Sequence, residues 1–178
     1  MEPILQDYID AWAGLDRKTF IQQIGVPVLI SKAYQDYMVF QSEATKFKES
    51  EIDTQPIRDH ETLNHRQQVF EIRKIKPGPT HQITVGRSED NDLVIHDETV
   101  SAQHALFLRD IKTSITQLQD RESTNGTRVN GAFLLPGRTP RLQDGDRILF
   151  GDAEFFFYSP GGLYDELSKM FESKSASK

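Results

Sequence analysis

Short runs of apolar and β-branched residues recur along the second half of the chain, and turn residues separate them. From Gln67 onward these runs alternate with stretches rich in Gly, Pro, Asn and Asp. They are VFEIRKI, QITVGR, DLVIH, HALFLRD, SITQLQD, TRV, FLL, DRILFG and EFFFYS. Many short strands with regularly spaced turn signals are typical of an all-β sandwich. We therefore predict a mainly β fold, with an antiparallel β-sandwich over residues 67–160.

The two ends of the chain show helical rather than strand periodicity. Near the N-terminus four apolar residues fall on one helical face, namely Ile4, Tyr8, Ile9 and Trp12. Asp16 is a candidate cap for a second helix, which Gly25 would end. The run VPVLIS (26–31) and the run YMVF (37–40) are candidate strands. After the sandwich, LYDELSKMFES predicts a helix over 161–172 that covers the sandwich, followed by a disordered tail at 173–178.

A polar stretch without periodicity separates these parts. Residues 41–66 contain almost no regularly spaced apolar positions, which is typical of a linker or a loosely held arm. The sequence therefore predicts a helical and mixed N-terminal extension at 1–45 and a polar linker at 46–66.

Composition narrows the classes of function. The 178 residues include no cysteine, which excludes disulfides, thiolate metal ligands and cysteine nucleophiles. The net charge is −6; residues 1–65 hold 6 Lys and Arg against 11 Asp and Glu, and residues 66–160 hold 12 against 13. Because nucleic-acid binding needs a basic surface, this balance disfavours it. No apolar run reaches membrane-spanning length and the N-terminus is acidic, so we expect a cytoplasmic protein without membrane insertion.

Four polar clusters lie between the predicted strands, where loops commonly carry function. They are Gly86-Arg87, Ser101-x-x-His104, Thr124-Asn125-Gly126 and Asn130-Gly131. If their loops meet at one end of the sandwich, a guanidinium fork, a hydroxyl and an amide come together. Arg gives bidentate, charge-assisted hydrogen bonds to oxyanions, and Asn offers both a donor and an acceptor to a peptide backbone. The pattern therefore favours an oxyanion receptor.

The order and spacing of these clusters resemble the forkhead-associated (FHA) domain. The matching text is TVGRSEDNDLVIHDETVSAQHALF, then LQDRESTNGTRVNGAFL, then LQDGDRILFGDAEFFFY, which together span roughly Val69 to Tyr158. The resemblance implies two twisted antiparallel sheets that bind phosphothreonine peptides through loops at one end. It also implies a non-enzymatic adaptor in Ser/Thr kinase signalling, without a cofactor, whose partners are phosphothreonine-containing proteins.

The resemblance assigns roles to individual residues. Arg87 and Ser101 would bind the phosphate, Thr124 would help to form the pocket, and Asn125 would bond the main chain of the ligand. Thr99 stands where the family often reads the third residue after the phosphothreonine. Five residues would support the site structurally: Gly86, His104, Gly126, Asn130 and Gly131.

The chain departs from the family pattern at one position, and two other classes of function remain open. Where the family often has Arg or a polar residue directly after the serine, this chain has Ala102. A phosphate-independent protein interaction module on the same fold is therefore the first alternative, and a hydrolase that uses Ser101, His104 and an Asp is the second. A calcium loop at Asp90 and Asp92 lacks the required glycine and the bidentate Glu, and no P-loop is present.

The polar linker adds a hypothesis about regulation. Thr54 and Thr62 lie in acidic text and are candidate phosphorylation sites, so a modified linker could fold back onto the phosphate site. The simpler reading is that both are ordinary linker threonines. The N-terminal extension is a candidate for binding another protein or for self-association.

Overall fold

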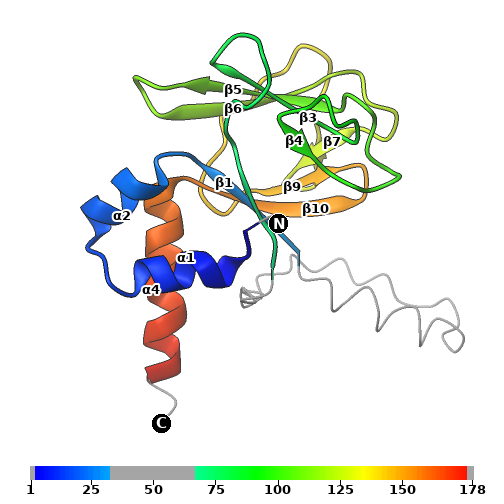
Figure 1. Cartoon of the computed structure of the whole chain (residues 1–178). Helices are drawn as coiled ribbons and strands as arrows, with labels where there is room; N and C mark the ends of the chain where they lie inside the picture. Colours follow the sequence, from blue (N-terminus) through cyan, green and yellow to red (C-terminus); the bar gives the residue numbers. More distant parts are fainter. Residues whose placement is uncertain (1–2, 33–66, 176–178) are drawn as a thin grey trace, which may run out of the picture.

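The computed structural model describes residues 3–32 and 67–175, and Figure 1 shows their arrangement. The elements follow the order α1 (Leu5–Trp12), α2 (Arg17–Ile24), β1 (Val28–Ser31), β2 (Val69–Glu71), β3 (Gln82–Gly86), β4 (Leu93–Val94), β5 (Ala105–Asp110), β6 (Ile115–Asp120), β7 (Thr127–Val129), β8 (Ala132–Phe133), β9 (Arg147–Phe150), β10 (Ala153–Tyr158) and α4 (Pro160–Ser175). Each of the apolar runs predicted after Gln67 overlaps a strand, although FLL shares only Phe133 with β8.

The strands form two sheets packed face to face. One has the order β2-β1-β10-β9-β7-β8 and the other the order β4-β3-β5-β6. Pairing is antiparallel throughout except between β3 and β4, which run parallel. Between the sheets lies a core that includes Phe107, Leu118, Ile148 and Phe150, all with no exposed surface. The predicted mainly β sandwich with helices at both ends is confirmed.

Strand β1 belongs to the sandwich although it lies far before residue 67. It pairs with β10, Val28 opposite Tyr158, and with β2 on its other side. Successive strand residues point to opposite faces: Leu29 enters the core between the sheets, whereas Val28 and Ile30 pack against the helices. The sheet therefore uses a strand from outside the predicted 67–160 range. The run VPVLIS marks the strand, but periodicity does not reveal its partners.

The three helices within residues 3–32 and 67–175 cover the outer face of the six-stranded sheet near β1 and β10 (Figure 1). The second apolar cluster, between helices and sheet, includes Phe20, Leu163 and Leu167, none of which is exposed. The helix ends follow the sequence. The Asp16 carboxylate accepts the backbone N–H groups of Lys18 and Thr19 and caps α2, which ends at Gly25 in the left-handed conformation (φ 67°).

Helix α4 is longer than the predicted 161–172. It begins at Pro160, a favoured first helical residue, and the Ser159 hydroxyl accepts the Gly162 N–H at 3.0 Å. The Asp144 carboxylate in turn accepts the Ser159 hydroxyl at 3.0 Å, which fixes the helix start to the sheet. Because the following residues include Glu and Lys, which favour helices, α4 continues to Ser175, into the predicted tail.

Several predictions concern residues outside the described ranges. They are the candidate strand at 37–40, the linker at 46–66 and the candidate phosphorylation sites Thr54 and Thr62. Among the described helices, none is both long and apolar enough to cross a membrane.

Candidate phosphopeptide-binding site

The loop after β3 and the loop before β5 lie side by side. The backbone N–H of Arg87 donates to the Ser101 carbonyl oxygen at 2.9 Å, and the Arg87 Nε donates to the Val100 carbonyl oxygen at 3.2 Å. The Arg87 side chain is exposed. Its two terminal guanidinium nitrogens have no hydrogen bond or ion pair with any described residue. The side chain is therefore anchored at its base and presents a free, charged fork.

The close approach of these loops depends on Gly86, the last residue of β3. A Cβ atom there would collide with the carbonyl oxygen of Ala102 and lie 2.8 Å from the Asn91 amide nitrogen. That amide donates to the carbonyl oxygens of Ser88 and Ala102, at 2.9 and 2.7 Å. Gly86 and the buried Asn91 together hold the Arg87 loop against the Ser101 loop.

The loop between β6 and β7 brings Thr124 to Ser101. The backbone N–H of Thr124 donates to the Ser101 hydroxyl oxygen at 2.9 Å, and the two hydroxyl oxygens lie 3.4 Å apart. Ser101 is half-buried and Thr124 is exposed. Together with Arg87, these contacts place a guanidinium and two hydroxyls from three separate loops at one end of the sandwich.

Asn125 connects this end to Thr99. The Asn125 amide nitrogen donates to the Thr99 carbonyl oxygen at 2.8 Å, which leaves the amide oxygen and a second N–H open among the described residues. The Thr99 hydroxyl is engaged: it donates to the Asp97 carboxylate at 2.5 Å and accepts the Asp152 N–H at 2.9 Å. The Thr99 backbone N–H also donates to the Asp97 carboxylate, at 2.8 Å, so both hydrogen-bond donors of Thr99 are used inside the protein and neither is available to a ligand.

His104 is fully buried beneath the site. Its Nδ1 accepts the Ser101 backbone N–H at 3.0 Å, so the proton is on Nε2, which lies 3.3 Å from the Gly126 carbonyl oxygen. Burial lowers the pKa of His104, against the opposing effects of the Gly126 carbonyl and the Asp120 charge. Neither ring nitrogen is directed at the Ser101 hydroxyl. The ring braces two loops of the site, and this geometry argues against a Ser101-His104 catalytic pair.

The second Asn-Gly step forms the turn between β7 and β8. Asn130 and Gly131 both have positive φ, 51° and 83°, as a two-residue type I′ turn requires. The Asn130 amide donates to the Asp146 carboxylate at 2.7 Å, and its amide oxygen accepts the Arg147 N–H at 2.9 Å. These side-chain bonds fix the hairpin to the start of β9.

Sequence reasoning missed Asp120, which shapes the Thr124 loop from inside. Its carboxylate accepts the Ser123 hydroxyl and the Thr127 hydroxyl, both at 2.6 Å, and the Ser123 N–H at 3.0 Å. Burial acts to raise the pKa of Asp120, but these hydroxyl bonds outweigh it and lower the pKa. An Asp followed three residues later by Ser is a local turn signal that could have been read.

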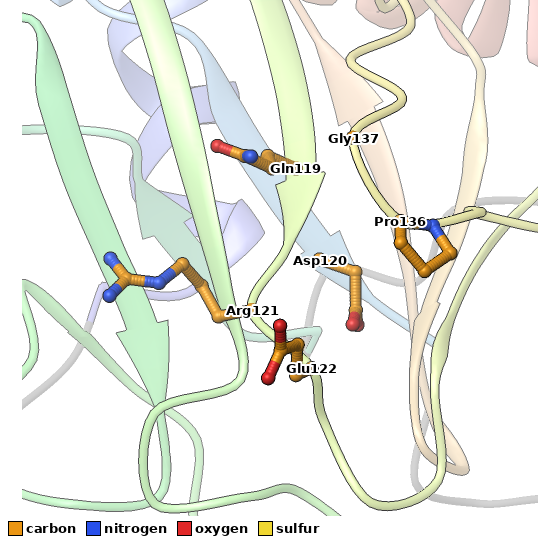
Figure 2. A pocket seen from close by; sticks show the side chains of 6 residues that line it. All are labelled: Gln119, Asp120, Arg121, Glu122, Pro136 and Gly137. Carbon is orange, nitrogen blue, oxygen red and sulfur yellow. The ribbon is translucent and has the colours of Figure 1, made fainter.

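Beside this loop lies a cavity of about 360 Å³ (Figure 2). Its walls are Gln119, Asp120, Arg121, Glu122, Pro136 and Gly137. The cavity thus separates the end of β6 from the segment that follows β8. No group of three or more His, Asp or Glu side chains with metal-binding geometry occurs within residues 3–32 and 67–170.

Comparison with known proteins gives a family match for part of this chain. Residues 83–151 match the family model of the FHA domain. The chain is 27% identical over 112 residues to the probable serine/threonine-protein kinase fhkA of Dictyostelium discoideum, which covers 57% of this chain and 19% of the kinase. It is 34% identical over 92 residues to the ABC transporter ATP-binding/permease protein Rv1747 of Mycobacterium tuberculosis, which covers 48% of this chain and 10% of that protein.

The solved structures that resemble this chain include FHA domains. The FHA domain of an Arabidopsis thaliana hypothetical protein is 30% identical, with a TM-score of 0.43, over 52% of this chain and 74% of that one. The chain spans about a fifth or less of the length of the two curated relatives. With the motif order and the loop geometry above, the family match identifies residues 83–151 as a forkhead-associated domain.

Proposed function

We propose that this protein is a non-enzymatic adaptor whose FHA domain binds phosphothreonine in a partner protein. Arg87 would receive the phosphate dianion on its free guanidinium fork, and Ser101 and Thr124 would donate their hydroxyls. Charge-assisted hydrogen bonds from Arg to phosphate are among the stronger ones in proteins. Asn125 would bond the ligand backbone with the amide groups that the Thr99 contact leaves open.

The observation that carries this proposal is the meeting of Ser101 and Thr124 beside an unpaired arginine. The Thr124 N–H bond to the Ser101 hydroxyl oxygen uses an acceptor lone pair at 2.9 Å. It leaves the Ser101 O–H only the long 3.4 Å contact with Thr124. A donor that is held in place but weakly satisfied suits an incoming anion.

A Ser/Thr kinase would phosphorylate the partner protein and so create the phosphate dianion that Arg87 is proposed to bind. A cytoplasmic location is also proposed. Thr54 and Thr62 are proposed as phosphorylation sites that would compete with an external ligand. A role of the N-terminal extension in binding another protein or in self-association is also proposed.

Titration of one threonine peptide with and without phosphate tests the function. The peptide is chosen from an oriented phosphothreonine library screened against the full chain. We expect binding only of the phosphorylated form, and we expect Arg87→Ala to weaken it by about 2–3 kcal/mol, the range for losing a charge-assisted contact. Lys112→Ala serves as the matched control, because Lys112 is an exposed cation on the turn between β5 and β6.

The alternative, a phosphate-independent interaction module, has a specific observation behind it. Ala102 is exposed and gives the Ser101 loop no polar side chain at that position. If that alternative holds, both forms of a binding peptide have equal affinity and Arg87→Ala changes neither. Equal affinities would therefore refute the phosphothreonine proposal.

A further inference from the structure

Strand β8 and the segment after it expose large apolar side chains beside the proposed site. Phe133 is 56% exposed and Leu135 is 62% exposed, whereas Leu134 between them packs against the core. This alternation directs Phe133 and Leu135 outward from the edge of the six-stranded sheet. With the exposed Pro136 they form a surface that we call the β8 patch. Adjacent exposed apolar side chains of this size commonly mark an interaction site.

The β8 patch touches the loop that carries Asn125. A Cβ atom on Gly126 would lie 2.9 Å from Cε1 of Phe133, so the aromatic ring lies directly on the Gly126 α-carbon. The Arg128 guanidinium carbon lies 4.4 Å from the centre of the same ring, a cation–π contact that holds the ring in place. Phe133 is therefore a fixed side chain next to Asn125.

The cavity described above extends the patch on its other side. Pro136 belongs both to the β8 patch and to the cavity wall (Figure 2). Across from it are Arg121 and Glu122, whose side chains form no hydrogen bond or ion pair with any described residue. The patch and the cavity thus share Pro136 and adjoin one another.

We propose that the β8 patch selects phosphothreonine ligands that carry a large apolar side chain close to the phosphothreonine. This inference rests on the proposed function. A ligand backbone bonded to Asn125 passes beside Gly126, and an extended peptide advances about 3.3 Å per residue. A side chain within about four residues of the phosphothreonine therefore reaches Phe133. The ring, Leu135 and Pro136 remove that side chain from water.

A flanking ligand residue fits this surface better than a second copy of the chain does. Three side chains provide far less than the roughly 1,200 Å² that stable protein interfaces bury. The Arg128 guanidinium, which lies over the Phe133 ring, places a positive charge at the patch and suits a ligand that carries a phosphate. A single apolar residue of a phosphopeptide matches both the small area and the charge.

The test is a phosphothreonine peptide array in which Leu, Phe or Ser occupies each flanking position in turn. It is probed with the full-length wild type, Phe133→Ser/Leu135→Ser, Arg87→Ala and, as an exposed apolar control, Ile111→Ser, a residue that is 67% exposed on the β5–β6 turn. We expect the wild type and Ile111→Ser to prefer Leu or Phe over Ser at one position by roughly ten-fold. The double variant should lose that preference but bind the all-Ser peptide as the wild type does.

The possible outcomes separate this inference from the function on which it rests. The inference is overturned if the wild type shows no apolar preference or if the double variant retains that preference. In either case, binding that Arg87→Ala abolishes would still support the proposed function. Equal weakening of all peptides by the double variant also overturns the inference. A wild type that dimerises through the patch, with a monomeric double variant in light scattering, assigns the patch to self-association instead. If no phosphopeptide binds the wild type, the function and the inference fail together.

Discussion

Asp92 is expected to be a main electrostatic support of the site end of the sandwich, and the replacement Asp92→Asn tests this. Its carboxylate has no exposed side-chain surface and ion-pairs with the Lys74 ammonium at 2.9 Å. One oxygen accepts the backbone N–H groups of Ile75 and Lys76, at 2.8 and 2.6 Å. The other accepts the N–H and hydroxyl of Thr84, at 2.9 and 3.1 Å. The carboxylate thus joins the segment after β2 to β3, which leads to Arg87.

The pKa of Asp92 indicates how much its carboxylate contributes to the stability of the fold. Burial alone would raise it, but the Lys74 ammonium and the backbone N–H groups outweigh burial and lower the pKa from 3.8 to about 2. Each factor of ten in proton affinity corresponds to about 1.4 kcal/mol, so the carboxylate contributes about 2 kcal/mol to folding at neutral pH. Because the folded pKa is depressed, this stability is present above the unfolded pKa. It is lost as the pH falls from about 4 toward 2, with about 1 kcal/mol gone at pH 3.

Asp92→Asn removes the charge and turns one acceptor oxygen into a donor that faces N–H groups. We expect a loss of about 2–4 kcal/mol at pH 7, since an unpaired Lys74 is also left behind. Urea unfolding between pH 3 and 7 measures it, and the gap between variant and wild type should narrow as the pH approaches 3. The control Asp165→Asn breaks the half-exposed ion pair with Arg17 and should cost less than about 1 kcal/mol. A constant gap across this pH range, or none at pH 7, would refute the reasoning.

Two further predictions concern the loops of the site. Asn125→Ala should weaken phosphopeptide binding by about 1 kcal/mol or more with little change in stability, because Asn125 is exposed. Asn130→Ala should instead cost about 1–2 kcal/mol of stability, because it removes the hydrogen bonds to Asp146 and to the start of β9. Binding calorimetry and urea unfolding of both variants measure the two effects, and a reversed pattern would contradict this division of roles. Burial lowers the pKa of His104, so the folded state favours the neutral ring and stability should fall as the pH drops from about 6.5 toward the lower folded pKa. A ring resonance in NMR that titrates above pH 6.5 would contradict it.

Local signals in the sequence were sufficient for much of the fold. Alternating apolar residues gave the strands, and Asp16 and Gly25 marked the ends of α2, because caps and strand periodicity act within a few residues. The position of β1 between β2 and β10 depends on pairing between residues far apart, as between Val28 and Tyr158. No local pattern encodes such a pairing.

The candidate site likewise contains residues that local motifs predict and contacts that only the folded chain reveals. The motifs identified Arg87, Ser101 and Thr124, which the structure brings together. They could not show that the Thr99 hydroxyl accepts the Asp152 N–H, because this contact arises only when separate loops meet. Nor could they show that Phe133 lies on Gly126, since an exposed aromatic residue leaves no periodic signal.

The position of β1 also determines when the chain can fold. Val28 is synthesised long before its partner Tyr158, so β1 must wait without its neighbour on β10 while β2 to β9 are translated. Contacts of such long sequence separation slow folding and leave a strand edge open to wrong partners in the meantime. The site can therefore become fully supported only once β10 has been synthesised, and a chain truncated before β10 would contain every proposed phosphate-binding residue and still have an incomplete sheet.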